Sequence, residues 1–421
     1  MSLVLYKGVV CPFCGCLCDD LEVEVEDGKI LSTKNACPVS RSKFLSHAED
    51  RAKPMVDGRE VRVEEAIEEA ARILREADFP LIYGLSSTEA EAQRLAVRLA
   101  ELTGASLDNT SSTCHGPTVL AAQECGAVKC TLGEVKNRAD LVVFWGCNPA
   151  EAHIRHPVRY SITPLGMYRQ GKKERFTVHV DVRETRTSKM VNQFIRVKEG
   201  KDYELLSALR AAVRGYEVKE AAGVPGEKIK ELAERMKGCK FGIIFFGMGL
   251  TMSKGKNLNI DAALRLVRDL NDYTKFLIMP MRGHFNVAGA NEVLTWLTGY
   301  PFAINFSRGY PVYNPGEFSA VDLLYRGECD AALILASDPA AHFPAGAVRH
   351  LASIPTIVID PKVSLTTKLA KVVIPSAIVG IECDGTAYRM DGIPLRLKKL
   401  VASPYLPDRE ILEKIIERVG G

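Results

Sequence analysis

Short apolar runs, rich in β-branched and aromatic side chains, recur along this chain and constrain its fold more than any other feature. They read PLIYGLS (80–86), DLVVFWG (140–146), FTVHVDV (176–182), FGIIFFGMG (241–249), TKFLIMP (274–280), AALILAS (331–337) and PTIVIDP (355–361). Each lies between helical segments or loops that contain glycine and proline. Strands that are apolar on both faces are typical of a parallel sheet covered by helices, so the sequence predicts an α/β fold.

Two amphipathic helices are expected on either side of the first run. The stretch VEEAIEEAARILREA (63–77) has the spacing of a helix with one apolar face. On that face it places Ala66, Ile67, Ala70, Ala71 and Leu74. The stretch TEAEAQRLAVRLAELTG (88–104) follows the strand and ends at a glycine, which favours the end of a helix.

The chain contains an internal repeat. FWGCNPAEAH (144–153) resembles ILASDPAAH (334–342): a strand, then Asn or Asp with Pro-Ala, then a helix start. Each is followed by a second strand that ends in aspartate. A constant offset of 179 aligns Asp181 with Asp360, Arg183 with Lys362, Thr185 with Ser364, Thr187 with Thr366, Lys189 with Lys368 and Ile195 with Ile374. Two similar nucleotide-binding lobes are one interpretation, because ligands bind at the carboxyl ends of such strands. A duplicated scaffold without a ligand is the other.

Four cysteines crowd into the stretch VVCPFCGCLCDD (9–20). Cys11, Cys14 and Cys18 form C-x2-C-x3-C, and Cys37 follows in NACPVS. Three thiolates on a short loop plus one distant thiolate fit an iron–sulfur cluster, in which Cys16 could replace Cys18. A zinc site is the competing interpretation, although the second C-x2-C pair of a zinc ribbon is missing. Unliganded thiols are the third. The cluster interpretation indicates electron transfer rather than hydrolysis.

Charge and composition exclude several classes of function. The net charge is +3 and there is no run of Lys and Arg, so nucleic acid is not an expected partner. No apolar run is long enough to cross a bilayer, since KFGIIFFGMGL is short and contains glycines. We see neither a secretory signal nor a twin arginine near the N-terminus. The 12 cysteines then point to metal ligation in a reducing cytoplasm.

Several motifs occur here in the order found in the molybdopterin oxidoreductases, which include formate dehydrogenases. They are C-x2-C-x3-C-x18-C, the EEAI helix, GCNPAEAH, DVRETRT, FGMGLTMSKG, RGHFNVAG and IECDGTAYR. The most specific stretches are STCHGPTVLAAQECG and MRGHFNVAGANEVLTWLTGYPFAINFSRGYP. With them the chain resembles, over nearly its whole length, the B subunits of the formylmethanofuran dehydrogenases of methanogenic archaea.

The resemblance implies a redox-active metal centre. One tungsten or molybdenum is expected, bound by two molybdopterin guanine dinucleotides, with a thiolate ligand at Cys114, which is a soft donor. Beside it, His115 is expected to transfer a proton, and the planar fork of Arg282 to hold the one-carbon substrate. His284 is similar in type but less securely mapped. A 4Fe–4S cluster is also implied, with the ligands Cys11, Cys14, Cys18 and Cys37.

The two pterins are expected to bind one at each half of the repeat. Glycines let the backbone approach phosphates, and Asp and Thr side chains suit guanine and ribose. The resemblance implies Asn148, Asp181, Arg183, Thr185, Gly247 and Gly249 for the first half, and Asp338, Asp360, Glu382, Gly385 and Thr386 for the second. Lys43 matches the basic residue between cluster and pterin in many relatives, and Arg41 competes for that role.

The implied architecture is a molybdopterin oxidoreductase fold in three parts. Residues 1–52 are expected to hold the cluster, residues 53–110 with 285–421 to form the lobe of the second repeat, and residues 111–284 that of the first. Relatives that work alone continue past the GT motif into a C-terminal β-barrel. The 35 residues after Thr386 are too few for such a barrel, so we expect a separate β-barrel subunit.

The predicted activity is reversible reduction of CO2 to formate, the first step of methanogenesis from CO2. Expected partners are an amidohydrolase-like subunit with a dinuclear metal, the small β-barrel subunit and a polyferredoxin. No H-x-H motif is present, so the N-formyl bond is expected to form in another subunit. His153 and His156 follow the GCNPAE loop, where the fold explains them. The alternatives are a stand-alone formate dehydrogenase and a metal-free electron-wiring subunit of an NADH dehydrogenase-like complex.

Overall fold

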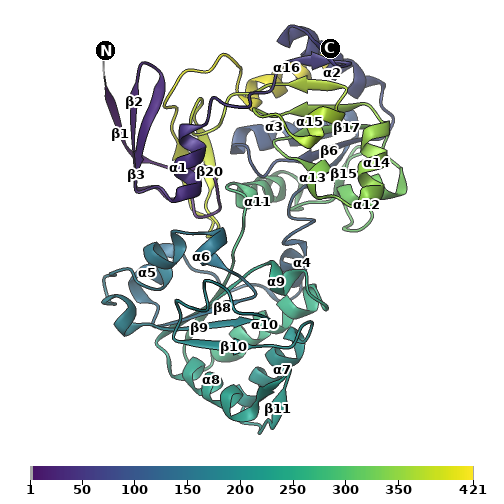
Figure 1. The fold of residues 1–421 in the computed structure, drawn as a ribbon. Coiled ribbons are helices and arrows are strands. Elements are labelled where there is room, and N and C mark those ends of the chain that lie inside the picture. The colour runs from purple at the N-terminus through teal and green to yellow at the C-terminus, as the bar shows by residue number, and fades with distance from the viewer. Residues whose placement is uncertain (1–2, 421) are drawn as a thin grey trace. The chain divides into compact units, whose positions relative to one another are not determined.

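The computed structural model describes residues 3–420, and the chain divides into two compact units (Figure 1). The inserted unit comprises Cys114–Gly283 and Met390–Ile393. The host unit comprises the chain up to Thr113, His284–Arg389 and the chain from Pro394 onward. The chain therefore changes unit directly before Cys114 and directly after Gly283, next to two of the predicted catalytic residues.

The inserted unit is built on a parallel sheet. Within the described residues this sheet has five strands in the order β10-β9-β8-β13-β14, and every neighbouring pair is parallel. Four of them are runs that were predicted as strands from the sequence, and β10 is an addition. The strands are β8 (Leu141–Trp145), β9 (Phe176–Asp181), β10 (Gln193–Arg196), β13 (Phe241–Phe246) and β14 (Lys275–Pro280).

Helices cover this sheet and form its core. Trp145 and Val180 share one buried cluster with α7 (Asp202–Val213), α8 (Gly226–Gly238) and α10 (Asn257–Leu270) (Figure 1). The indole N–H of Trp145 donates to the carboxylate of Asp202 at 2.9 Å, which ties the sheet to α7. The remaining elements are α4 (Gly116–Cys125), α5 (Leu132–Arg138), α6 (Pro149–Ala152), the π-helical turn Pro157–Ser161, the 3-10 turn Gly171–Glu174, β11 (Glu220–Ala221), β12 (Val224–Pro225) and α9 (Met248–Thr251).

The host unit has a larger mixed sheet. Among residues 3–420 its order is β16-β15-β7-β6-β17-β18-β19-β4-β5. The central run from β7 to β19 is parallel, and the outer pairs are antiparallel. The strands are β4 (Met55–Val56), β5 (Arg59–Glu60), β6 (Pro80–Gly84), β7 (Ser106–Asn109), β15 (Ile304–Asn305), β16 (Val312–Tyr313), β17 (Ala331–Leu335), β18 (Thr356–Ile359) and β19 (Val372–Ile374).

Helices cover both faces of this sheet. Since successive strand residues point to opposite faces, neighbouring residues pack against different helices. Leu333 packs in the cluster of α2 (Val63–Glu76), α3 (Ala90–Thr103) and α16 (Asp408–Gly420), and Ile334 in that of α12 and α14. The two predicted amphipathic helices are confirmed as α2 and α3, and all five predicted apolar residues of α2 are buried. The other helices are α11 (Val287–Thr298), α12 (Ala320–Arg326), α13 (Pro339–His342), α14 (Ala345–Ser353) and α15 (Leu365–Leu369).

The N-terminal part of the host unit is a small sheet beside a helix. Strands β1 (Val4–Val9), β2 (Leu21–Glu26) and β3 (Lys29–Lys34) form an antiparallel sheet next to α1 (Pro38–Leu45) (Figure 1). A hairpin, β20 (Gly385–Tyr388) and β21 (Pro394–Leu397), follows later in the chain. In the described part of the chain, no helix combines the length and the apolar character needed to cross a bilayer.

Candidate active site

Most predicted site residues of the inserted unit follow the carboxyl ends of its parallel strands. Asn148 follows β8, Asp181 ends β9, Gly247 follows β13 and Arg282 follows β14. Since β9, β8, β13 and β14 are consecutive neighbours in a parallel sheet, these residues share one edge of the sheet. This edge is where ligands bind in doubly wound α/β folds.

Cys114 stands just before α4, at the start of the inserted unit. Its carbonyl accepts a hydrogen bond from Oγ1 of Thr251 in α9 at 2.9 Å, which fixes the backbone of the thiol. Burial raises the pKa of the Cys114 thiol to about 11, while the positive charge of Arg282 lowers it. The two predicted residues are therefore close enough to interact electrostatically. A bare Cys114 would stay protonated near neutral pH, whereas a bound cation would favour its thiolate.

His115 begins α4 and is fully enclosed. Its side chain is 1 % exposed, and Nδ1 lies 3.1 Å from Oγ1 of Thr118. Its Nε2 is buried and has no hydrogen-bond partner of normal geometry. Burial, followed by the charge of Arg282, lowers the pKa of His115 to about 3. The backbone of Met281 opposes this shift without cancelling it, so His115 is a neutral imidazole with a weakly bonded nitrogen.

Two further histidines lie in the interior of the inserted unit. Nε2 of His153 lies 2.8 Å from the carbonyl oxygen of Arg282, and both residues are buried. His156 is completely buried, with Nδ1 3.0 Å from Oγ of Ser161 and its ring edge-on to Phe245. From the sequence, both histidines were attributed to the fold. The contact with Arg282 links His153 to a predicted catalytic residue instead.

A matching turn occurs in each unit at the predicted pterin residues. Asn148 and Asp338 have nearly the same backbone angles, φ −121° and ψ 73° against φ −124° and ψ 69°. Oδ1 of Asn148 accepts hydrogen bonds from N and Oγ1 of Thr187 at 3.3 and 2.7 Å. Oδ1 of Asp338 accepts the same pair from Thr366 at 2.9 and 2.5 Å. The internal repeat is therefore a repeat of hydrogen bonding as well as of sequence.

The backbone before these turns also repeats. Gly146 and Ala336 both have left-handed φ values, +55° and +50°. The N–H of each donates to the carbonyl of the neighbouring strand, Val180 in one unit and Ile359 in the other, at 2.9 Å in both. An alanine in this region of φ is strained, and glycine is not.

The glycines of FGMG pack tightly against the turn after β8. A Cβ on Gly247 would lie 2.7 Å from Cβ of Cys147, and one on Gly249 would lie 2.7 Å from the carbonyl oxygen of Gly146. Gly249 also donates its N–H to Gly146 at 2.9 Å. The close approach of these two loops therefore requires glycine at both positions. The sequence alone did not indicate this structural reason for the two glycines. Their contact with a cofactor stays a prediction.

The two aligned aspartates differ in environment. Asp181 accepts the backbone N–H of Arg183 at 3.3 Å, and Asp360 accepts that of Lys362 at 2.8 Å. Burial raises the pKa of Asp360 to about 7, and the charges of nearby acids add to this effect. The ammonium of Lys362 donates to three backbone carbonyls, those of Ser46, His47 and Glu49. Lys362 thus holds the segment after α1. In the first repeat, Arg183 is exposed and Thr185 is half-buried.

The remaining predicted residues of the second repeat lie around β20. Glu382 is 5 % exposed and forms an ion pair with Arg51 at 3.0 Å. It also accepts hydrogen bonds from Ile378 N and Ser403 Oγ. Gly385 packs so closely on Glu89 that a Cβ would lie 2.5 Å from the Cβ of Glu89. The carboxylate of Glu382 is therefore engaged within the protein, and Thr386 is half-buried in β20.

Three of the predicted cluster cysteines lie in the loop between β1 and β2, and the fourth lies at the start of α1. The N–H of Cys11 bonds to the carbonyl of Cys18 at 2.9 Å, which closes the loop that carries three of the thiols. Cys37 caps α1, and its sulfur accepts the N–H of Ser40. Sγ of Cys11 lies 3.1 Å from Oγ of the same serine. Among residues 3–420, no three Cys, His, Asp or Glu side chains have the spacing of a metal site. The ligand set stays a prediction.

Cys16 and Lys43 both act on Cys14. A hydrogen bond from Cys16 and, to a smaller extent, the charge of Lys43 lower the pKa of Cys14 to about 7, whereas burial opposes them. The ammonium of Lys43 also lies 5.3 Å from the ring centre of Phe13. Arg41 is exposed. His284 belongs to the host unit, where its Nδ1 lies 3.4 Å from Oγ1 of Thr110.

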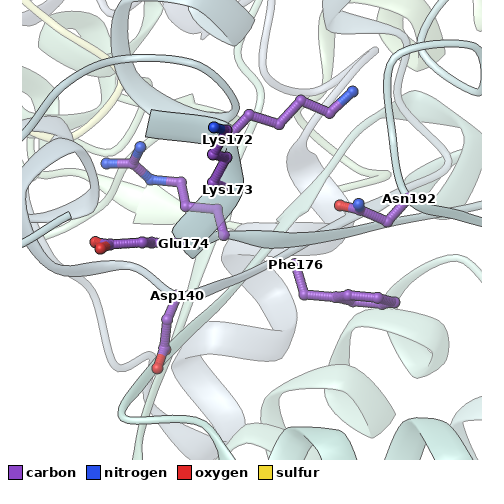
Figure 2. A pocket seen from close by; sticks show the side chains of 7 residues that line it. Asp140, Lys172, Lys173, Glu174, Phe176 and Asn192 are labelled. Atoms are coloured by element: carbon purple, nitrogen blue, oxygen red, sulfur yellow. The ribbon is translucent and has the colours of Figure 1, made fainter. Parts of the chain in front are cut away.

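A surface pocket of about 740 Å³ lies at the opposite edge of the inserted sheet (Figure 2). Asp140 precedes β8 and Phe176 begins β9, so the pocket is at the amino ends of the strands. Two of its charges are already engaged: Asp140 accepts the N–H groups of Lys240 and Phe241, and the guanidinium of Arg175 donates to backbone carbonyls. None of the predicted site residues lines it.

Sequence reasoning missed three residues that hold the site together. Thr251 bonds to the backbone of Cys114, His153 to that of Arg282, and Arg51 pairs with Glu382. Thr251 and His153 stand within motifs of the resemblance, FGMGLTMSKG and GCNPAEAH, which is the only signal that could have singled them out. Nothing in the sequence separates Arg51 from the other arginines.

Two solved structures share the fold of this chain. No model of a known protein family matches the chain. Acetylene hydratase from Pelobacter acetylenicus shares the fold, with a TM-score of 0.72 and 14% identity over 99% of this chain and 69% of that one. A chain in the crystal structure of the formyltransferase/hydrolase complex FhcABCD from Methylorubrum extorquens, in complex with methylofuran, has a TM-score of 0.71 and 27% identity, covering 87% of this chain and 98% of that one.

A much closer similarity is found at the level of sequence. The chain is 54% identical over 427 residues to the B subunit of the tungsten-containing formylmethanofuran dehydrogenase 2 of Methanocaldococcus jannaschii. The alignment covers 98% of each protein. The chain therefore belongs to the family of formylmethanofuran dehydrogenase B subunits, and it is a component of an oxidoreductase complex.

Proposed function

We propose that this chain is the subunit at which a formylmethanofuran dehydrogenase complex interconverts CO2 and formate. In the reducing direction, CO2 takes up two electrons and one proton and gives formate. The observation that supports this best is the pair of Cys114 and Arg282, a half-buried soft thiol within electrostatic reach of a guanidinium. A thiol and a cation at the carboxyl edge of a parallel sheet suit a metal ligand and an anion-binding group.

The donor chemistry of the site fits a tungsten or molybdenum centre. Cys114 would hold the metal through its sulfur, since soft thiolates suit such ions. The relative from Methanocaldococcus jannaschii is named as tungsten-containing, which favours that metal. Two pterin guanine dinucleotides would complete the centre, which when bound supplies two-electron redox chemistry.

The side chains beside Cys114 have roles that follow from their chemistry. Arg282 would bind the carboxylate of formate through its planar fork, or orient CO2 and stabilise negative charge on its oxygens. His115 would hold or release the proton at Nε2, the buried nitrogen that has no hydrogen bond of normal geometry. A neutral imidazole can take up a proton only where negative charge develops, so His115 suits a proton transfer coupled to the redox step.

Electrons would enter through a 4Fe–4S cluster in residues 1–52. We propose Cys11, Cys14, Cys18 and Cys37 as its ligands, with Cys16 as the alternative to Cys18. Lys43, whose charge acts on Cys14, would lie between the cluster and a pterin, and it is better supported than Arg41.

The pterin dinucleotides would lie along the strand ends of the two repeats, one in residues 111–284 and one in residues 53–110 with 285–421. The matching turns at Asn148 and Asp338 support two similar binding lobes. The full set proposed is Asn148, Asp181, Arg183, Thr185, Gly247, Gly249, Asp338, Asp360, Glu382, Gly385 and Thr386.

The proposed partners are the other subunits of the complex. They are an amidohydrolase-like subunit with a dinuclear metal, where formate would be condensed with methanofuran, a small β-barrel subunit and a polyferredoxin. A relative of this fold is found in a complex designated FhcABCD, which supports assembly with other subunits. We place the complex in the cytoplasm, without a nucleic-acid or membrane partner.

The test compares two thiols of the inserted unit in the assembled complex. Cys114→Ala should abolish formate oxidation with a viologen dye and lower the tungsten content, while the iron–sulfur absorption persists. Cys130→Ala removes a buried thiol outside the proposed site and should retain the rate. Turnover of formate by Cys114→Ala at an ordinary rate would contradict the proposal. The same chain without its amidohydrolase-like partner should not act on formylmethanofuran.

A further inference from the structure

A buried histidine contacts the backbone of the arginine proposed to bind substrate. Nε2 of His153 lies 2.8 Å from the carbonyl oxygen of Arg282, and the two residues are 3 % and 8 % exposed. A carbonyl oxygen only accepts hydrogen bonds, so Nε2 must carry the hydrogen. Burial lowers the pKa of His153, which favours the neutral ring and avoids a second positive charge beside Arg282.

The peptide of Arg282 lies just beyond the end of β14, where the chain leaves the sheet of the inserted unit. Met281 donates its N–H to the carbonyl of Phe246 at 2.7 Å, which extends the pairing of β13 and β14 beyond the end of β14. Arg282 donates its own N–H to Pro280, two residues earlier, at 3.1 Å, so the chain turns sharply there. After Gly283 the chain leaves the unit. The imidazole of His153 therefore bonds to the carbonyl of a peptide that lies beyond the last strand residue of β14.

The internal repeat shows that packing alone does not require this histidine. The offset of 190 that pairs Asn148 with Asp338 also pairs His153 with Phe343, which is 8 % exposed and packs edge-on to Tyr83. The equivalent position in the host unit thus accepts a ring that has no N–H group. At this position, directly after the short helix, the imidazole occurs only in the lobe that carries the arginine, whereas His342 of the other lobe ends α13 and is exposed.

The strand topology supports the same comparison. In the inserted unit β8 pairs with β13 and β13 with β14, and Arg282 lies two residues beyond β14. In the host unit β17 pairs with β6 and β6 with β7, and the position two residues beyond β7 is Ser111. Where the second repeat has Ser111 in place of the arginine, it has Phe343 at the position of His153.

We propose that His153 is a positioning residue that fixes the peptide of Arg282, so that the guanidinium meets the one-carbon substrate in the correct orientation. This inference rests on the proposed function of Arg282. The side chain of His153 touches the backbone of Arg282 and need not touch the substrate. Its loss should therefore weaken binding of formate more than it slows the reaction of bound formate.

The test uses three variants of His153 in the assembled, metal-loaded complex. His153→Phe introduces the residue of the other lobe, which preserves a buried ring and removes the N–H. His153→Gln can place an amide N–H near the position of Nε2, whereas His153→Asn is too short to reach it. The measurements are the KM and kcat for formate with a viologen dye, the tungsten content and the midpoint of thermal unfolding.

We expect His153→Phe and His153→Asn to raise the KM for formate roughly fivefold to tenfold, the loss of one hydrogen bond of about 1 kcal/mol, with a smaller change in kcat. His153→Gln should restore the KM to within roughly threefold of the native value. If His153→Phe does not assemble, the contrast between Gln and Asn gives the same answer. An equal KM in all assembled variants, or equal losses in Gln and Asn, would overturn the inference.

Arg282→Ala separates this inference from the proposed function. If Arg282→Ala leaves the formate kinetics unchanged, the role proposed for the arginine is wrong. If Arg282→Ala abolishes formate oxidation while every assembled His153 variant keeps the native KM, only the positioning role of His153 is wrong.

Discussion

Replacing one threonine in each repeat should destabilise the two matching turns by different amounts. Thr187→Val removes a hydroxyl that donates to Oδ1 of Asn148 at 2.7 Å and accepts the N–H of Ala150 at 3.2 Å. The side chain of Thr187 is completely buried, so water cannot replace either bond. Valine has nearly the same shape, and the effect is therefore that of the lost hydrogen bonds.

The magnitude follows from these two bonds. A neutral buried hydrogen bond contributes about 1 kcal/mol, and a buried N–H left without a partner costs more, so Thr187→Val should cost about 2–3 kcal/mol. Thr366→Val removes a hydroxyl that donates to the carboxylate of Asp338, at Oδ1, over 2.5 Å. The same hydroxyl accepts the N–H of Ala340 at 3.1 Å. Bonds to charged groups are stronger, so this change should cost about 3–4 kcal/mol.

Amide hydrogen exchange of the purified complex measures this effect locally. Peptides that contain α6 or α13 should exchange faster in the variant of their own unit, by about thirtyfold for each 2 kcal/mol of lost stability. Thr187→Ser and Thr366→Ser keep the hydroxyl and lose only a methyl group, so each should lose about 1 kcal/mol or less. Equal exchange in the Val and Ser variants would refute the assignment of stability to these hydrogen bonds.

Three further predictions concern charge, backbone and pH. Arg282→Lys keeps the charge but loses the planar fork, so the KM for formate should rise and kcat should fall; unchanged steady-state kinetics would make the arginine structural. Gly146→Ala would place a Cβ 2.7 Å from the backbone N of Leu250, so it should cost about 1–3 kcal/mol in chemical unfolding although alanine occupies the matching position 336. Burial raises the pKa of Asp360 to about 7 in the folded protein. As pH rises, the unfolded chain therefore releases this proton at a lower pH than the folded protein does. Stability should fall as pH rises from about 4 to about 7 and change no further above that. Asp360→Asn should remove that part of the slope in thermal midpoints measured across this pH range, and an unchanged slope would show that other groups cause it.

The elements that the sequence predicted are those whose stability is local or strongly patterned. The apolar runs became the central parallel strands, and α2 and α3 begin and end within two residues of their predicted limits. Strands β10 and β19 were not predicted, because they are short and are defined by pairing with β9 and β18 in the folded sheets. Pairing of this kind depends on tertiary structure, which no local pattern of residues encodes.

The candidate site was predictable as a set of residues but not as a set of contacts. The order of the motifs predicted Cys114, His115 and Arg282, and the structure brings them into electrostatic contact. The side-chain oxygens of Asn148 and Asp338 proved to be bonded to threonines that follow the neighbouring strands, β9 and β18. A polar residue at a strand end can bind a ligand or brace its own loop, and the sequence alone does not distinguish these roles.

The interrupted course of the host unit has a consequence for synthesis and folding. Strand β6 lies between β7 and β17, and β17 lies beyond the whole of the inserted unit in the chain, apart from the short segment Met390–Ile393. The inserted unit is almost continuous, so it can fold while the ribosome still makes the rest. Until residue 335 has emerged, every residue of β6 lacks its neighbour on the β17 side, and β7 is the only adjacent strand available. Exposed apolar strands of this kind are prone to aggregation, so the nascent host unit is the part of this protein that most needs protection by chaperones.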